Sequence, residues 1–546
     1  MQSYHPEVDR VLLNGMVITV DQDFTLAEAV AIRDGRIAAV GTTEEIRSLA
    51  GSHTRTDDLA GGILMPGIID AHNHLLSTSQ VLQQIQLYDC RSVGEILERV
   101  RERVRSARPG EWIIGRGWDE TLLAERRHPS RWEIDTVAPN NPVVLHRVWN
   151  KLTANSAAIS AAGVSRETPD PPTDELYAGG FERDEHGEPA GLFRDRAKEL
   201  ILRAIPEPTN EDLVNALSVG TRAYNAVGIT GVAEPGLGPR ELRAYQTAHD
   251  RGQLSVRTDM LLGGWGYVPS SREPELKRWI SEMGIYAGFG DEVLRLGGVK
   301  FLLDGGVGDR TARMNRSYEG EPGNHGQWAV DPEEAPELIR WVHDQGWSID
   351  AHTCGDAAQE LAVRGFVAAQ TASPNPALHH RVHHAYVPTP ETIDLMGRHQ
   401  IPALVSNPFL VHLGDSFVES LGADRAKRAL PMASYLRARV PLAGSSDSPI
   451  ADFNPWVGMY AAIARRSING WQFDPSEAIS ITEALRSYTI TGASVLGLAD
   501  KRGSIEPGKV ADLIHLDRNP LQVGTEDVKE TRVLRTMVAG SWVYEE

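Results

Sequence analysis

The stretch that decides the fold is LMPGIIDAHNH, residues 64–74. Its short apolar run is typical of a buried strand, and the run ends in two histidines, His72 and His74. Side chains two positions apart in a strand point to the same face, so both imidazoles would point to one spot just beyond the carboxyl end of this strand. Two neutral imidazoles on one face suit Zn²⁺ or a similar ion. A pair of surface loop histidines is the alternative interpretation.

Seven further apolar runs follow this strand, and helix-length amphipathic segments separate them. The segment 92–107 shows the helical pattern, with apolar positions at helical spacing behind the capping pair Ser92 and Glu95. About eight strands alternating with helices predict an α/β fold, a (β/α)₈ TIM-like barrel. The expected strands are residues 67–71, 228–233, 256–262, 296–303, 348–351, 381–384, 402–405 and 440–444.

The two ends of the chain have a different pattern, with strands and no helices between them. Residues 11–15 and 17–20 predict one hairpin, and residues 29–41 predict a second one around Asp34-Gly35. Strand patterns return in residues 511–516, 532–539 and 541–544. We therefore expect residues 1–60 and 499–546 to form one composite β-sandwich domain. The barrel would span residues 61–498, with an insertion at about 110–196 over its mouth.

Lys300 lies inside the apolar run 296–303. A buried ammonium group is costly unless its pKa falls or an acid pairs with it. A neutral lysine can take up CO₂ and form a carbamate that bridges two metal ions. A salt bridge to Asp304 or to another acid is the simpler alternative.

Other polar residues end the later apolar runs. His352 and the pair His383–His384 each follow a short run, where a hydrogen-bonded core histidine is the usual alternative to a metal ligand. Asp447 follows the last run in a turn of small residues, where an aspartate often serves the turn itself. Because the carboxyl ends of barrel strands meet at one face, these residues and His72 predict a shared metal site there.

At this point the chain resembles the amidohydrolase superfamily, and within it the amidohydrolase-3 group that includes YtcJ-like proteins and N-substituted formamide deformylases. The resemblance covers nearly the whole chain. The motifs that carry it are PGIIDAHNHL (66–75), VKFLLDG (299–305), RVHHA (381–385), GSSDSP (444–449) and GSIEPGKVADL (503–513).

The resemblance implies a site for one or two divalent ions, with zinc the expected metal. Its register selects His384 rather than His383. A carboxylated Lys300 would bridge the ions, and Asp447 would carry the catalytic proton transfer to the leaving nitrogen. The implied ligands are His72, His74, Lys300, His352, His384 and Asp447.

The resemblance also implies where a substrate would bind. The expected contacts are Trp118, Asp119, Arg310, Trp149 and Lys151, although Lys151 departs from the Gly-His that relatives often carry there. We expect hydrolysis of a linear amide, an N-acyl or N-formyl amine with an apolar or aromatic substituent. Hydrolysis of an ester, carbamate or cyclic amide, or a deamination, is the alternative on the same barrel. A non-catalytic scaffold predicts gaps in the ligand set, and the sequence has none.

The amino-acid composition argues against some classes of binding partner. The formal net charge is −19, from 55 basic and 74 acidic side chains, which argues against nucleic acid and anionic membranes. Only two cysteines occur, which excludes a disulfide scaffold and fits a reducing compartment. We expect a cytoplasmic enzyme with a small-molecule substrate and no membrane partner, assembled as a homodimer or a higher homo-oligomer.

Overall fold

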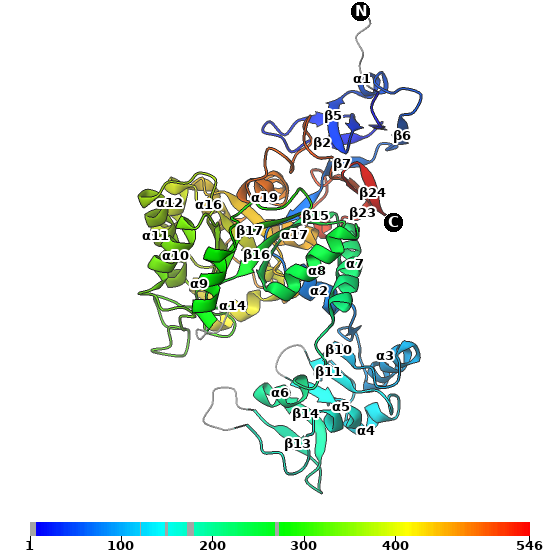
Figure 1. The fold of residues 1–546 in the computed structure, drawn as a ribbon, viewed down its shortest axis with the longest axis vertical. Coiled ribbons are helices and arrows are strands. Elements are labelled where there is room, and N and C mark those ends of the chain that lie inside the picture. The colour runs from blue at the N-terminus through cyan, green and yellow to red at the C-terminus, as the bar shows by residue number, and fades with distance from the viewer. Residues whose placement is uncertain (1–6, 121, 148–150, 172–178, 268–271) are drawn as a thin grey trace, which may run out of the picture. The chain divides into compact units, whose positions relative to one another are not determined.

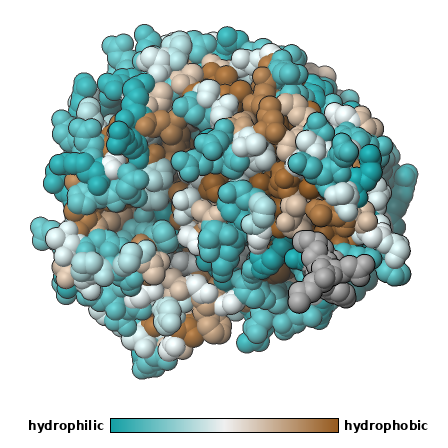
Figure 2. All heavy atoms as spheres, turned by 90° about the horizontal axis from the view of Figure 1, so that it is seen from above, coloured by the Kyte–Doolittle hydropathy of each residue, from teal (hydrophilic) through white to brown (hydrophobic). Residues whose placement is uncertain are grey.

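The computed structural model describes residues 7–120, 122–147, 151–171, 179–267 and 272–546 (Figure 1). The chain divides into two compact units, one of residues 1–78 with 217–546 and one of residues 79–216. Hydrophilic side chains cover most of the face drawn in Figure 2, with apolar side chains in patches among them. Among the described residues, none of the helices has the length and apolar character that crossing a membrane requires.

The first unit contains a sheet of eight parallel strands. Each strand pairs with its neighbour in chain order, and the backbone N–H of Ala71 donates to Gly444 O at 3.2 Å between the first and last of them. The predicted (β/α)₈ barrel is therefore confirmed. Its strands are β8 (Ile68–Asp70), β15 (Ile229–Leu237), β16 (Arg257–Gly263), β17 (Leu294–Leu302), β18 (Ile349–Thr353), β19 (Arg381–His384), β20 (Ala403–Ser406) and β21 (Leu442–Ser445).

Helices follow the barrel strands along the chain. These segments form helices because their apolar residues repeat at helical spacing. In α10 (Ala335–Asp344), for example, Leu338, Ile339 and Val342 form the buried stripe. The other long helices of the barrel are α7 (Asn210–Ala226), α8 (Pro239–Asp250), α9 (Glu273–Glu282), α11 (Asp356–Ala372), α12 (Pro390–His399) and α17 (Pro455–Ala464).

Two sheets built from both ends of the chain form the small domain, as predicted. A four-stranded sheet has the order β5 (Arg36–Gly41), β4 (Ala29–Arg33), β1 (Arg10–Leu13), β6 (Arg55–Asp58). A six-stranded sheet has the order β24 (Ser541–Glu545), β23 (Val533–Val538), β22 (Leu513–Leu516), β7 (Ile63–Pro66), β2 (Met16–Ile18), β3 (Leu26–Ala27). Buried residues of both segments, including Leu12, Val30, Leu64, Leu513 and Met537, share one core.

The sequence misplaced two strands of this domain. The predicted hairpin of residues 11–15 and 17–20 is wrong, because β1 and β2 belong to different sheets. The turn at Asn14, which has φ 60°, carries the chain from one sheet to the other. Strand β7 lies in the six-stranded sheet, although residues from 61 onward were expected in the barrel. The hairpin of β4 and β5 around Asp34-Gly35 is confirmed.

The second unit has its own sheet and its own core. The strand order is β13 (Phe181–Arg183), β14 (Pro189–Arg194), β12 (Lys151–Ala154), β11 (Val143–Arg147), β10 (Ile113–Trp118), β9 (Ile85–Gln86). Helix α3 (Val93–Ser106) begins at the predicted cap, where Ser92 Oγ accepts from the backbone N–H of Glu95 at 3.2 Å. This unit, residues 79–216, is larger than the insertion expected at about 110–196.

Candidate metal centre

His72 and His74 follow β8 at the carboxyl end of the barrel strands and meet Asp447, which follows β21. His72 Nε2 lies 2.9 Å from Asp447 Oδ1, and His74 Nε2 lies 3.3 Å from the same oxygen. His72 is buried, whereas the side chain of His74 is 25% exposed. Burial opposes ionisation of Asp447, but His72, His74 and His384 around it hold its pKa well below the usual range. The carboxylate is therefore ionised at neutral pH.

Lys300 is wholly buried on β17, with Nζ 3.2 Å from His72 Nδ1. Burial lowers its pKa to about 7, against the opposing charges of Asp350 and Asp447. The predicted alternative partner, Asp304, instead accepts hydrogen bonds from the backbone N–H groups of Arg313, Cys354 and Gly355. Lys300 therefore belongs to the histidine cluster, and its ammonium group loses a proton more readily than that of an exposed lysine.

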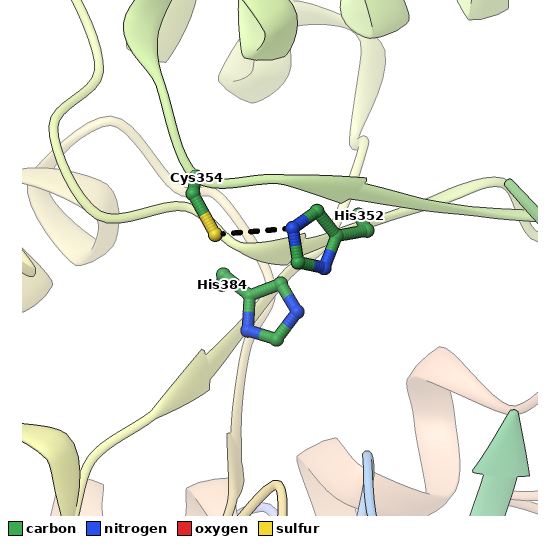
Figure 3. A group of neighbouring side chains, drawn as sticks. All are labelled: His352, Cys354 and His384. Atoms are coloured by element: carbon green, nitrogen blue, oxygen red, sulfur yellow. Dashed lines mark hydrogen bonds between the residues drawn. The ribbon is translucent and has the colours of Figure 1, made fainter. Parts of the chain in front are cut away.

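His352 on β18 and His384 on β19 face each other, with ring centroids 4.3 Å apart (Figure 3). His352 Nε2 lies 3.2 Å from Gly305 O and 3.3 Å from Cys354 Sγ. These contacts hold the His352 ring in place, with its Nδ1 directed away from the Cys354 thiol. His384 Nδ1 is 3.1 Å from the hydroxyl of Tyr386. His384 Nε2 is buried and has no hydrogen-bond partner among the described residues.

The adjacent His383 has a different environment. Its Nε2 lies 2.6 Å from Asp350 Oδ1, and Asp350 also binds the buried Arg381 through both oxygens. Its Nδ1 contacts His72 Nδ1. His383 thus joins an ion-pair network beside the cluster, while His384 presents an unused nitrogen to it. This arrangement supports the choice of His384 as the ligand.

The donor set fits a divalent cation. Two groups, His72–His74–Asp447 and His352–Cys354–His384, each bring their donor atoms within 4.8 Å of one another. Burial, followed by the charge of Lys300, lowers the pKa of His72 to about 3 and that of His352 to about 4. The imidazoles are therefore neutral at pH 7 and have lone pairs for an ion. A cation would also satisfy the unpaired nitrogen of His384.

The backbone at two of these residues is strained. His384 has φ 70° and Asp447 has φ 56°, in the left-handed region that residues other than glycine seldom adopt. Such conformations cost about 1–3 kcal/mol and collect at functional sites. Both residues sit where the chain leaves a barrel strand, so the turn directs each side chain into the cluster.

Four of the predicted substrate contacts, Trp118, Asp119, Lys151 and Arg310, have partners within the fold. Trp118 is wholly buried in the core of the second unit, and its Nε1 donates to Leu145 O at 2.9 Å. Lys151 pairs with Glu120 at 2.6 Å, and Arg147 lies 3.3 Å from Asp119. Arg310 binds Glu321 and the carbonyl oxygen of Glu319. These partners give each side chain a structural role. Trp149 lies outside the described residues.

A cleft that the sequence did not predict lies beside the carboxyl ends of β15 and β16. Its volume is about 700 Å³, and its lining combines apolar residues, Tyr267, Leu276, Trp279 and Met283, with charged ones, Glu241, Arg272, Glu275, Arg278 and Glu282. Burial raises the pKa of Tyr267, and the charge of Asp447 adds to that rise. Gly263 in its lining is the register partner of Lys300 on β17, so the cleft lies next to the strand that carries Lys300. The Gly-rich segment GGWGY that follows a barrel strand, residues 263–267, is the sequence signal that could have indicated it.

Comparison with known proteins agrees with this geometry. The amidohydrolase family matches residues 55–544, and an imidazolonepropionase-like composite domain of bacteria matches residues 29–50. The chain is 31% identical over 552 residues to N-substituted formamide deformylase of Arthrobacter pascens, covering 98% of each chain. It is 29% identical over 541 residues to YtcJ of Bacillus subtilis, covering 97% of this chain and 98% of YtcJ.

A solved structure shows the same architecture. An uncharacterized metal-dependent hydrolase from Pyrococcus furiosus superposes with a TM-score of 0.76 at 27% sequence identity, over 94% of this chain and 100% of that one. The family match and these alignments extend through both the barrel and the small domain. The chain belongs to the amidohydrolase family and is a metal-dependent hydrolase of that family.

Proposed function

We propose that this protein hydrolyses the C–N bond of a linear amide, an N-acyl or N-formyl amine that carries an apolar or aromatic substituent. The observation that carries the proposal is the 31% identity to N-substituted formamide deformylase over 98% of both chains. The cluster of neutral imidazoles, one carboxylate and one buried amine supplies the groups that such a hydrolysis needs.

His72, His74 and Asp447 would hold one divalent ion, and His352 and His384 would hold the other, with zinc the expected metal. A bound ion of this kind lowers the pKa of water from 15.7 to about 7 and polarises a carbonyl group. Asp447 is ionised and buried, so it accepts the proton that the attacking water loses. It then returns this proton to the departing nitrogen, and the amine leaves as a neutral molecule.

Lys300 would lie between the two ions as a carbamate. Because burial lowers its pKa to about 7, a large share of the amine is neutral and nucleophilic at physiological pH. Attack of Nζ on CO₂ forms one N–C bond and releases one proton, which leaves an anion among the histidines. This negative charge would replace a buried cation whose nearest polar contact is His72.

The apolar side chains of the cleft beside β15 and β16 support an apolar substituent on the substrate. Tyr267 and Trp279 offer aromatic surfaces, and Leu276 and Met283 add aliphatic ones. Aromatic rings in such a cleft favour flat, apolar groups over charged ones. The polar amide would then lie toward the histidines, and the substituent would lie along the cleft.

The test is a matched panel given to the zinc-loaded protein: an aryl formamide, the corresponding acetamide, ester and carbamate, a cyclic amide and an aminopurine. We expect amine release to be fastest from the linear amides and to disappear when the metal is removed. Rapid ester cleavage or deamination with inert amides would overturn the proposal. Metal analysis and the intact mass of the protein report separately on the number of ions and on carboxylation of Lys300.

A further inference from the structure

A second cavity lies at the opposite end of the barrel from the metal centre. It is lined at the amino ends of β16 and β17 by Arg257, Thr258 and Arg295, and its volume is about 210 Å³. Lys501, Arg502 and Val510 complete it from the segment that leads into the small domain. The cavity therefore joins the barrel to the small domain within the first unit, and the mechanism above does not use it.

Most of its charged residues are already paired. Arg257 donates to both oxygens of Asp512, at 2.6 and 3.0 Å, and Arg295 donates to both oxygens of Asp259, at 2.8 and 3.2 Å. The two acids in the lining also have partners. Asp291 lies 2.8 Å from His249, and Glu292 lies 2.6 Å from Arg36. Lys501 and Arg502 are the cations of the lining that have no ion pair with any residue the structure describes.

Arg502 is the unusual member of this lining. It is only 7% exposed, its Nε is buried without a hydrogen-bond partner, and no described acid lies within ion-pair distance of its guanidinium group. Burial, and then the charge of Arg257, lowers its pKa to about 10, so it remains charged at neutral pH. Gly231 packs against it, since a Cβ there would lie 3.4 Å from Nη1. The charges of Asp259 and Asp512 act on Arg502, but each of these acids already binds another arginine.

We propose that this cavity is a binding site for a small oxyanion of the size of phosphate, held by Arg502 with Lys501 at the rim. The planar guanidinium group presents a fork of donors that matches two oxygens of a phosphate or carboxylate group. An anion would supply the counter-charge and the acceptors that the described residues do not supply. Arg257 and Arg295 lie in the same lining, but Asp512 and Asp259 compensate their charges, so Arg502 and Lys501 carry the attraction for the anion.

The proposed anion site lies between the barrel and the small domain of the first unit. Arg257 and Arg295 belong to the barrel, whereas Lys501, Arg502 and Val510 lead into β22 of the small domain. An anion bound between them would hold these two parts of the first unit together. Binding only to the folded state raises stability with ligand concentration. We therefore expect phosphate to stabilise the protein beyond the effect of ionic strength.

The experiment is calorimetric titration of inorganic phosphate into the full-length protein, with thermal unfolding measured at constant ionic strength maintained with chloride. In the unaltered protein we expect saturable binding and a melting temperature that rises with phosphate. In Arg502→Gln the dissociation constant should increase at least about tenfold, the loss expected for a charged hydrogen-bond donor.

Lys501→Gln keeps the proposal testable if Arg502→Gln fails to fold, because Lys501 is exposed. This variant should bind phosphate more weakly, whereas Lys277→Gln, an exposed lysine on α9 away from the cavity, should bind it as the unaltered protein does. Absence of saturable binding, or an equal affinity in the Lys501 and Lys277 variants, would overturn the proposal. Hydrolysis of the amide panel is a separate measurement and does not depend on this result.

Discussion

His72 and Asp447 lie 2.9 Å apart, Nε2 to Oδ1, although 375 positions separate them in the sequence. One follows the first strand of the barrel and the other follows the last. The backbone N–H of Asp447 also donates to His72 O at 2.9 Å, so the same two residues help to join the ends of the barrel sheet. The joining of the barrel and the assembly of the candidate centre therefore depend on the same contact.

Replacing Asp447 with asparagine should lower turnover by about 10²–10⁴-fold, because the amide cannot accept the proton from water and pass it to the leaving nitrogen. The amide oxygen retains an acceptor for His72, so the fold should survive. The measurement is kcat on the best amide of the panel, with metal content and thermal unfolding as controls. Full turnover in a metal-replete Asp447→Asn protein would remove Asp447 from the proton transfer.

His383 and His384 form a matched pair of adjacent residues. His384→Asn should remove the ion that His352 and His384 would hold, because it deletes the buried Nε2 that has no hydrogen-bond partner among the described residues. His383→Gln should retain the ion and weaken its affinity by about 10–100-fold, the usual cost of disturbing a group behind a ligand. Metal titration of both variants distinguishes them. A greater loss of metal in the His383 variant would reverse the assignment.

Much of the barrel could be predicted because short stretches of sequence identify its strands. Each strand is a short apolar run, and each candidate ligand follows such a run, so strand order alone brought His72, Lys300 and His352 to one face. The choice between His383 and His384 was harder. It depends on Asp350 and Arg381, whose ion pair crosses from β18 to β19 and leaves no local pattern.

The errors arose where pairing is non-local. Asn14-Gly15 is a strong turn signal, but a turn does not determine whether the chain reverses within one sheet or crosses to another. Here β2 pairs with β7 and β3 rather than with β1. The expected substrate contacts stay a prediction, and the sequence did not reveal the partners that these side chains have in the fold. Lys151 finds Glu120 through the folding of the second unit, which the motif itself does not reveal.

The buried pair Arg257–Asp512 should contribute strongly to stability, because its side chains are only 4% and 6% exposed and it ties the barrel to the small domain. Asp512→Asn leaves Arg257 as an uncompensated buried charge. We expect a loss of about 3–5 kcal/mol in the free energy of unfolding. Arg340→Gln breaks an exposed pair with Asp344 on α10 and should cost about 0.5 kcal/mol. Urea unfolding followed by tryptophan fluorescence compares the two, and equal losses would contradict the prediction.

Glu120 should make stability depend on pH in the acid range. Burial opposes its ionisation, but Lys151 and Arg147 outweigh that effect and lower its pKa from the usual 4.5 to about 2. A carboxyl group whose folded pKa is depressed stabilises the protein above its unfolded pKa, and this contribution is lost as the pH falls toward the folded value. The unaltered protein should therefore melt at a higher temperature than Glu120→Gln at neutral pH, and the difference should shrink between about pH 4.5 and 2. Glu211→Gln, at an exposed glutamate on α7, serves as the control. A difference that stays constant through the acid range would show that the carboxylate of Glu120 gains nothing from Lys151 and Arg147.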